Sequence, residues 1–112
     1  MTIKKLKVTL KGPLWRLEAF EIEGIDVLKR WQEDSSKNEG SVTVTDFNLS
    51  TDNLLDIFIK IGAPNRTVYQ VVLSGNTKDP NMDIDYTQEN IIVKKNGRLN
   101  IILSKNINDI TK

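Results

Sequence analysis

The sequence predicts a mainly β protein, a single antiparallel β-sandwich of about seven or eight short strands that occupies residues 1–112 as one domain. Apolar and polar residues alternate along several segments, and turn-forming residues recur between those segments. The length of 112 residues fits one domain. Apolar residues make up 38% of the chain and charged residues 28%, which is typical of a globular protein rather than a disordered one.

The first half of the chain contains three segments with strand-like patterns. In residues 3–11, leucine and valine occupy one side and lysine the other, which predicts a half-buried strand. In residues 14–23 the alternation changes phase near Ala19, which predicts a β-bulge there or, alternatively, a helix. Residues 41–49 predict a further strand, with its own phase change near Asp46.

Two segments fit either a helix or a strand, and they decide the fold class. The alternative to the sandwich is an α+β fold with helices near residues 26–33 and 52–61. As a strand, the second segment places four apolar side chains on one face: Leu55, Ile57, Ile59 and Ile61. We therefore favour a strand for this segment, followed by a loop at residues 62–65 and another strand at residues 67–73.

Asn96-Gly97 is the strongest turn signal in the chain. Both central residues of a type I′ hairpin turn need a positive φ, which Asn and Gly tolerate best. The flanking residues 91–95 and 98–103 are rich in isoleucine, so we expect them to pair. The predicted pairs, in a hairpin interior to the sheet or covered on both sides, are Lys95 with Arg98, Lys94 with Leu99, Ile92 with Ile101 and Ile91 with Ile102.

Residues 56–73 are two predicted strands joined through Gly62-Ala63-Pro64-Asn65. This stretch resembles bacterial immunoglobulin-like and transthyretin-like modules, and the resemblance implies a sandwich of one of these two kinds. It is confined to this stretch, which contains no functional motif, so it implies nothing about activity.

The absence of two residue types excludes several kinds of chemistry. The chain has no cysteine and no histidine, so it has no disulfide, thiolate nucleophile, imidazole base or metal ligand of these types. A pair of carboxylates for glycoside hydrolysis would have to come from residues whose separation the sequence does not fix: Glu18, Glu21, Glu23, Asp46 and Asp56. We therefore expect a protein that is not an enzyme and has no cofactor.

One acidic segment has the spacing of a cation site. Residues 76–90 are predicted to form a loop with oxygen ligands at alternate positions: Asp79, Asn81, Asp83 and Asp85. Such ligands suit Ca²⁺, a hard cation that takes about six to eight oxygens. The positions where an EF-hand has its glycine and glutamate hold Ile84 and Asn90, so a solvated, turn-rich loop is the competing interpretation.

Tyr86 is the first candidate contact residue, because it lies in this acidic segment, where we expect it to be exposed. Trp15, Trp31 and Tyr69 are the other aromatic side chains considered for stacking on a sugar ring or anchoring a protein. We expect both tryptophans to lie in the core. A carbohydrate-binding module, with or without Ca²⁺, is the alternative function.

The nearly neutral chain contains segments of opposite charge. Its net charge is +1, but residues 1–11 and 91–112 are basic, whereas residues 17–39 and 76–90 are acidic. If the first strand lies beside the last hairpin, one basic edge results, formed by Lys5, Lys7, Lys11, Lys95 and Arg98. This polarity favours self-association or docking to a charged protein over nucleic acid, since no aromatic residues for base stacking alternate with the first three lysines.

The leading hypothesis is therefore a non-catalytic binding or assembly module that acts through protein–protein contacts. No segment is apolar over the length of a membrane span, and the first residues lack the apolar core of a signal peptide. We expect a cytoplasmic chain, or one that is exported by a route its sequence does not reveal. The abundance of Lys, Asn and Ile, whose codons are AT-rich, indicates a bacterial or phage origin.

Overall fold

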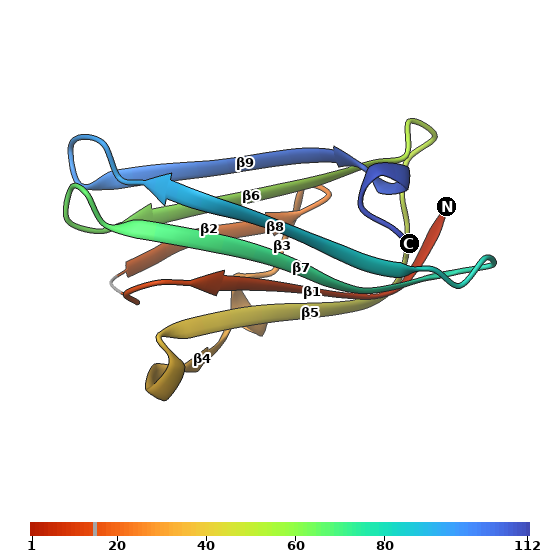
Figure 1. Cartoon of the computed structure of the whole chain (residues 1–112), viewed down its shortest axis with the longest axis horizontal. Coiled ribbons are helices and arrows are strands. Elements are labelled where there is room, and N and C mark those ends of the chain that lie inside the picture. The colour runs from red at the N-terminus through yellow and green to blue at the C-terminus, as the bar shows by residue number, and fades with distance from the viewer. Residues whose placement is uncertain (15) are drawn as a thin grey trace.

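The structure is a computed structural model that describes residues 1–14 and 16–112. Its strands form two antiparallel sheets that pack face to face, with both chain termini at the same end (Figure 1). The described strands are β1 (Thr2–Lys11), β2 (Arg16–Ile22), β3 (Ile25–Asp26), β4 (Gln32–Asp34), β5 (Glu39–Asn48), β6 (Leu54–Gly62), β7 (Val68–Lys78), β8 (Asp83–Ile92) and β9 (Arg98–Asn106). The described 3₁₀ helices are η1 (Leu28–Arg30), η2 (Ser35–Lys37) and η3 (Ile107–Asp109).

The larger sheet has the strand order β4-β5-β1-β7-β8, and the smaller sheet has the order β3-β2-β6-β9. All neighbouring strands are antiparallel. The predicted β-sandwich is confirmed. The described strands number nine rather than about seven or eight, because two very short ones, β3 and β4, lie between β2 and β5.

The two segments considered for helices are both described, and neither forms an α-helix. Residues 54–62 form β6, whose inward-facing side chains are almost fully buried: Leu55, Ile57, Ile59 and Ile61. Its isoleucines favour this pleated surface, which pairs with β2 on one side and β9 on the other. Residues 26–33 contain the end of β3, the single turn η1 and the start of β4. The α+β alternative is therefore wrong.

Both predicted phase changes are confirmed as irregularities of the strands. In β2 the register against β6 shifts between Leu17 and Ala19, so Glu18 is the extra residue of a bulge, and Phe20 is buried in the core. In β5, Asp46 adopts a positive φ of 53°, and the inward face of the strand changes phase there. Each irregularity lets a strand with an interrupted apolar pattern keep its apolar side chains inside.

The Asn96-Gly97 turn is confirmed, but the predicted hairpin is wrong. The two residues have φ values of 60° and 61°, and Lys95 pairs with Arg98. Beyond this pair the two segments separate, because β8 pairs with β7 in one sheet and β9 pairs with β6 in the other. In the described structure the following predicted pairs are not formed: Lys94 with Leu99, Ile92 with Ile101 and Ile91 with Ile102.

The physical reason is that each of these two strands has an apolar face that is buried only against the opposite sheet. The turn is therefore a crossover between the sheets, and it lies beside a second crossover formed by residues 63–67. The N–H of Ala63 donates to the carbonyl of Gly97 over 2.9 Å, and the N–H of Val93 donates to the carbonyl of Thr67 over 3.0 Å. These bonds satisfy backbone groups that a hairpin would have paired with each other.

The aromatic residues contribute to the core. Tyr69 is fully buried, and its hydroxyl group donates a hydrogen bond to the carbonyl of Pro13. Trp31 is half-buried, with its ring 5.9 Å from that of Phe20, and its indole covers Gly40, where a β-carbon would overlap the ring. The prediction that both tryptophans lie in the core is thus met only in part by Trp31, which packs against the core but is half-buried. Trp15 lies outside the described residues.

Candidate functional site

Among the described strands, the four at sheet edges differ in how far their outer backbone groups are covered. An uncovered edge offers N–H and C=O groups to another strand, so its protection determines whether a partner can add to it. β3 and β4 have only two and three residues, which limits what can pair with them. β8 and β9, with ten and nine residues, are long, and residues of both strands line one groove. Figure 1 shows the two strands on the same side of the molecule.

The edge of β8 is protected in three ways. The last residues of the chain pair with its first half: the N–H of Asp85 donates to the carbonyl of Ile110 over 2.8 Å, and Asp83 exchanges bonds of 3.2 and 2.9 Å with Lys112. In its second half, Asn90 has a positive φ of 57° at a register shift. The exposed side chains of β8 include three carboxylates: Asp83, Asp85 and Glu89. Covered ends, bulges and charges all discourage the addition of a strand.

Within the described chain, β9 has no paired outer segment and no bulge, and its central residues are uncharged. It pairs with β6 without a register shift, from Leu54 opposite Asn106 to Gly62 opposite Arg98. Residues 99–104 contain no charge and no proline, and the two charged residues of the strand, Arg98 and Lys105, lie near its ends. β9 is therefore a long, regular edge strand that is open along its outer side.

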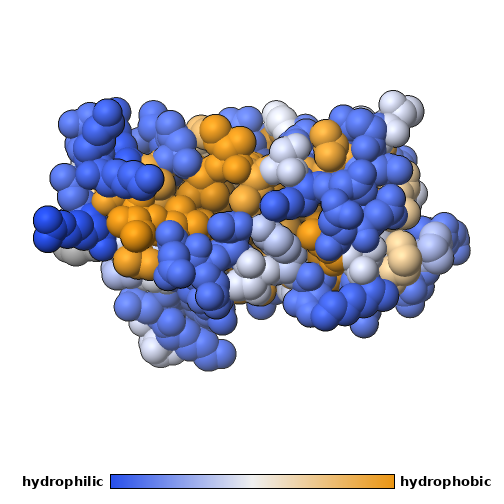
Figure 2. Space-filling view, turned by 45° about the horizontal axis from the view of Figure 1, so that its top comes forward, coloured by the Kyte–Doolittle hydropathy of each residue, from blue (hydrophilic) through white to orange (hydrophobic). Residues whose placement is uncertain are grey.

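Ile102 lies at the centre of this edge and is 73% exposed, the highest value among the large apolar side chains that the structure describes. On the outer face of the smaller sheet it lies opposite Phe58 of β6, which is half-buried. Figure 2 shows apolar surface gathered in the middle of the face that it presents. A long, regular edge strand with an apolar residue exposed at its centre is able to pair with another strand, which makes this edge a candidate contact surface.

A groove runs between β8 and β9. It has a volume of about 410 Å³ and is lined by Gln88 and Ile91 of β8 and by residues 100–105. The Nζ atom of Lys105 lies 5.0 Å from the centre of the Tyr86 ring, which is a cation–π distance. The Tyr86 hydroxyl group donates to Oε1 of Gln88 over 2.6 Å. The groove therefore combines isoleucine side chains with the polar groups of Gln88 and Lys105, both of which contact Tyr86.

The prediction that Tyr86 is exposed in a loop is wrong. Tyr86 belongs to β8, opposite Leu73 of β7, and is half-buried against the core. β7 ends at Lys78 and β8 begins at Asp83, so only residues 79–82 connect them. The Asp- and Asn-rich composition favours a loop locally, but cross-strand pairing overrides that preference.

The candidate calcium ligands are divided between this short turn and β8. Asp79 and Asn81 lie in the turn, where Asn81 accepts a hydrogen bond from Nδ2 of Asn76 over 3.0 Å. Asp83 and Asp85 lie in the strand, and Asp85 is 3.3 Å from Nζ of Lys112. Within residues 1–14 and 16–112, no three acidic side chains are grouped so that they could hold a metal ion. Calcium binding stays an untested prediction that this arrangement does not favour.

The predicted basic edge does not form one surface. β1 lies between β5 and β7 inside the larger sheet, so it is neither an edge strand nor a neighbour of β9. Lys5, Lys7 and Lys11 are exposed on the outer face of that sheet, whereas Lys95 and Arg98 flank the turn before β9. The premise that the first strand lies beside the last hairpin is wrong, because β1 is paired along both of its sides. That each of these residues contacts a partner stays a prediction.

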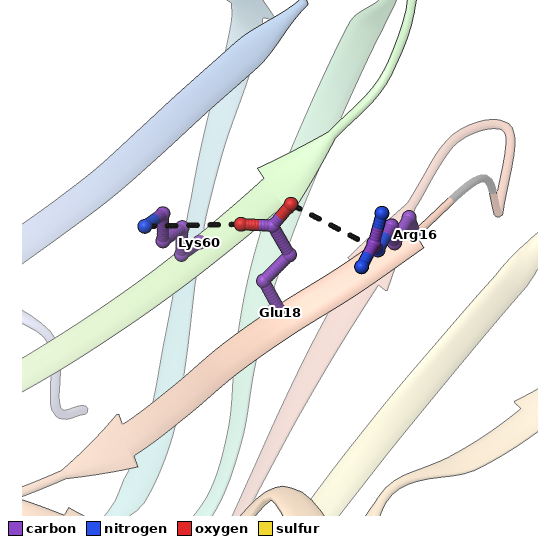
Figure 3. A network of polar contacts seen from close by, with 3 residues as sticks. All are labelled: Arg16, Glu18 and Lys60. Carbon is purple, nitrogen blue, oxygen red and sulfur yellow. Dashed lines mark ion pairs between the residues drawn. The ribbon is translucent and has the colours of Figure 1, made fainter.

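A surface ion-pair network lies on the smaller sheet (Figure 3). Glu18, the bulged residue of β2, lies 3.8 Å from Nζ of Lys60 in β6 and 4.0 Å from Nε of Arg16. The Arg16 side chain is 81% exposed, so its pair with Glu18 adds little stability. The ion pair between Glu18 and Lys60 connects the bulged part of β2 with β6.

Glu23 and Asp56 are the two residues of the hydrolysis hypothesis that make a direct contact. Oε2 of Glu23 accepts a hydrogen bond from the backbone N–H of Asp56 over 2.8 Å. Burial raises the pKa of the Glu23 carboxyl, the N–H of Asp56 acts against this rise, and the nearby charges of Asp56 and Asp52 add to it. Folding therefore makes the ionised form of Glu23 less favourable than it is in the unfolded chain.

Glu23→Gln is expected to raise the melting temperature at pH 7 and to leave it nearly unchanged at pH 3. Because the pKa of Glu23 is raised on folding, the folded state retains this proton longer, and stability falls as pH rises through the raised pKa. Glutamine keeps an oxygen that accepts from Asp56 but carries no charge. Melting curves of both proteins at the two pH values check this, and an equal difference at both would contradict it.

Comparison with known proteins yields no matching family model, no similar curated protein and no similar solved structure. The finer likeness to immunoglobulin-like or transthyretin-like modules therefore stays a prediction. In the described part of the chain, no helix is long and apolar enough to cross a membrane. The features of the molecule that bear on its function are the β9 edge, Ile102 and the adjoining groove.

Proposed function

We propose that this protein is a non-catalytic binding module that acts in assembly through protein–protein contacts, with the open side of β9 as its contact surface. The observation that carries this proposal is a regular, unprotected edge strand whose central side chain, Ile102, is 73% exposed. The free backbone groups of such an edge supply hydrogen bonds to an added strand, and the neighbouring groove supplies selectivity for its side chains.

The contacts of the aromatic residues favour protein over carbohydrate as the ligand. Tyr86 is held under Lys105 and bonded to Gln88, so its ring and hydroxyl group both have partners within the chain. Trp31 is half-buried and packs against Phe20, with its indole N–H donating to Glu33. An apolar strand edge, by contrast, pairs with another polypeptide and offers few groups to a sugar.

Site-specific photo-crosslinking tests this function. A benzophenone amino acid replaces Arg98, which is exposed at one end of β9 and leaves the centre of the edge intact; in the matched control it replaces Thr43, exposed on β5. We expect irradiation in the cells that produce the protein to give a protein adduct from position 98 and none from position 43. No adduct from position 98, or equal yields from both positions, would overturn the proposal.

A further inference from the structure

We propose that the partner at the β9 edge is a second copy of this chain, paired antiparallel about a two-fold axis that passes beside Ile102. This inference rests on the proposed function and names its partner. The two smaller sheets then join into one continuous sheet, β3-β2-β6-β9 followed by the same strands of the second copy in reverse order.

The register follows from the strand itself. Ile102 is the middle residue of β9, so centring the axis there pairs every residue of the strand. The pairs between copies are Ile102 with Ile102, Ile101 with Leu103, Asn100 with Ser104, Leu99 with Lys105 and Arg98 with Asn106. Each pair joins residues on the same face of the sheet, as antiparallel pairing requires.

The pairing is favourable on both faces. On the outer face, the exposed Ile102 side chains cover each other between amide and hydroxyl groups. On the inner face, Ile101 and Leu103 meet the same residues of the second copy, which extends both cores past the groove beside β9. Ile101 and Leu103 are already almost buried in one chain, so they need little further ordering.

Charge places no obstacle in this register. Arg98 lies opposite an asparagine and Lys105 opposite a leucine of the second copy, so no like charges meet directly. The two positive charges that each β9 strand carries, Arg98 and Lys105, lie near its ends and away from the two-fold axis.

A second copy explains the lack of protection better than an unrelated strand does. A two-fold axis matches one edge with itself, so two chains cover both open β9 edges and leave no further β9 edge to extend the assembly. The other long edge, β8, carries the protections that prevent such growth. The β8 edge is thus protected against pairing with another strand, whereas the β9 edge is open to pair with the second copy.

Charge exchange at position 102 tests this directly. Ile102→Lys and Ile102→Glu each place like charges opposite each other across the axis, and we expect either variant alone to dimerise at least about 30-fold more weakly than the wild type in sedimentation velocity. Mixing the two variants in equal amounts places Lys opposite Glu and is expected to restore dimers. Because Ile102 is exposed, neither change disturbs the core, and circular dichroism verifies the fold.

Ile25→Lys is the matched control, since Ile25 is 66% exposed but lies on β3 at the other edge of the same sheet. It is expected to dimerise like the wild type. The inference would be overturned if the wild type were a monomer, or if Ile102→Lys and Ile102→Glu were each dimeric alone. It would also be overturned if the mixture of these two variants formed no dimers. A monomer that still forms crosslinks from position 98 to a different protein would overturn the second copy alone, whereas no crosslink at all would overturn the proposed function as well.

Discussion

Gly75→Ala is expected to lower the free energy of unfolding by at least about 3 kcal/mol, a large part of the stability of a small domain. Gly75 lies in β7 opposite Leu6 of β1 and has a φ of 139°. A β-carbon there would lie 1.9 Å from the carbonyl oxygen of Lys5 and 2.8 Å from its carbonyl carbon. Because these atoms belong to the backbone of a central strand, no side-chain rotation relieves the clash and the sheet must open.

Gly24→Ala separates this clash from the effect of backbone conformation. Gly24 also has a positive φ, of 74°, but no atom lies within 4 Å of the position that its β-carbon would take. We expect a cost of about 1 kcal/mol there, from the left-handed conformation alone. Urea unfolding of the two variants and the wild type gives the comparison. A loss for Gly75→Ala no larger than that for Gly24→Ala would show that β1 and β7 are not packed as described.

Ile59→Ala is expected to cost about 3 kcal/mol of unfolding free energy. Ile59 is fully buried at the middle of β6, between Phe20 of β2 and Ile101 of β9. Removing most of its side chain leaves a cavity that these strands cannot close without breaking their pairing. The effect is large because β6 is an interior strand of the smaller sheet and faces the core along its whole length.

The control for this prediction is Ile25→Ala, which makes the same chemical change at a side chain that is 66% exposed. It is expected to change the free energy of unfolding by no more than about 0.5 kcal/mol. Thermal or urea denaturation at one protein concentration measures both variants. Similar losses of unfolding free energy at the two positions would contradict the structure, in which Ile59 is buried and Ile25 is exposed.

Strands whose burial pattern is local could be predicted from the sequence. The isoleucines of β6 alternate inward, and the phase changes of β2 and β5 correspond to a bulge at Glu18 and a positive φ at Asp46. The pairing of β8 and β9 could not be predicted in this way. Asn96-Gly97 specifies a turn, but whether the strands after a turn pair depends on which sheet buries each of them, and that is a property of the whole fold.

The candidate site depends on the same long-range information. Ile102 stands out in the sequence, because Ile101-Ile102-Leu103 puts an apolar residue on each face of its strand. This signal was consistent with an interior strand, and only the strand order places β9 at an edge. The acidic segment predicts an exposed Tyr86, but the side chain is half-buried in β8 and contacts Gln88 and Lys105, which line the groove. The lysines of β1 do not lie at an edge, because β1 is paired on both sides, and the position of a strand inside its sheet has no local signature in the sequence.

Disulfide trapping at position 102 tests the two-fold β9 interface most directly. Opposed residues of an antiparallel pair have Cα atoms about 4.5 to 5.5 Å apart, within the range that a disulfide spans. The chain has no cysteine of its own, so Ile102→Cys introduces a single thiol, and Ile25→Cys is the control at a similarly exposed position. We predict that mild oxidation converts Ile102→Cys to covalent dimers rapidly and Ile25→Cys slowly. Equal rates of dimer formation for the two variants would contradict the β9 interface.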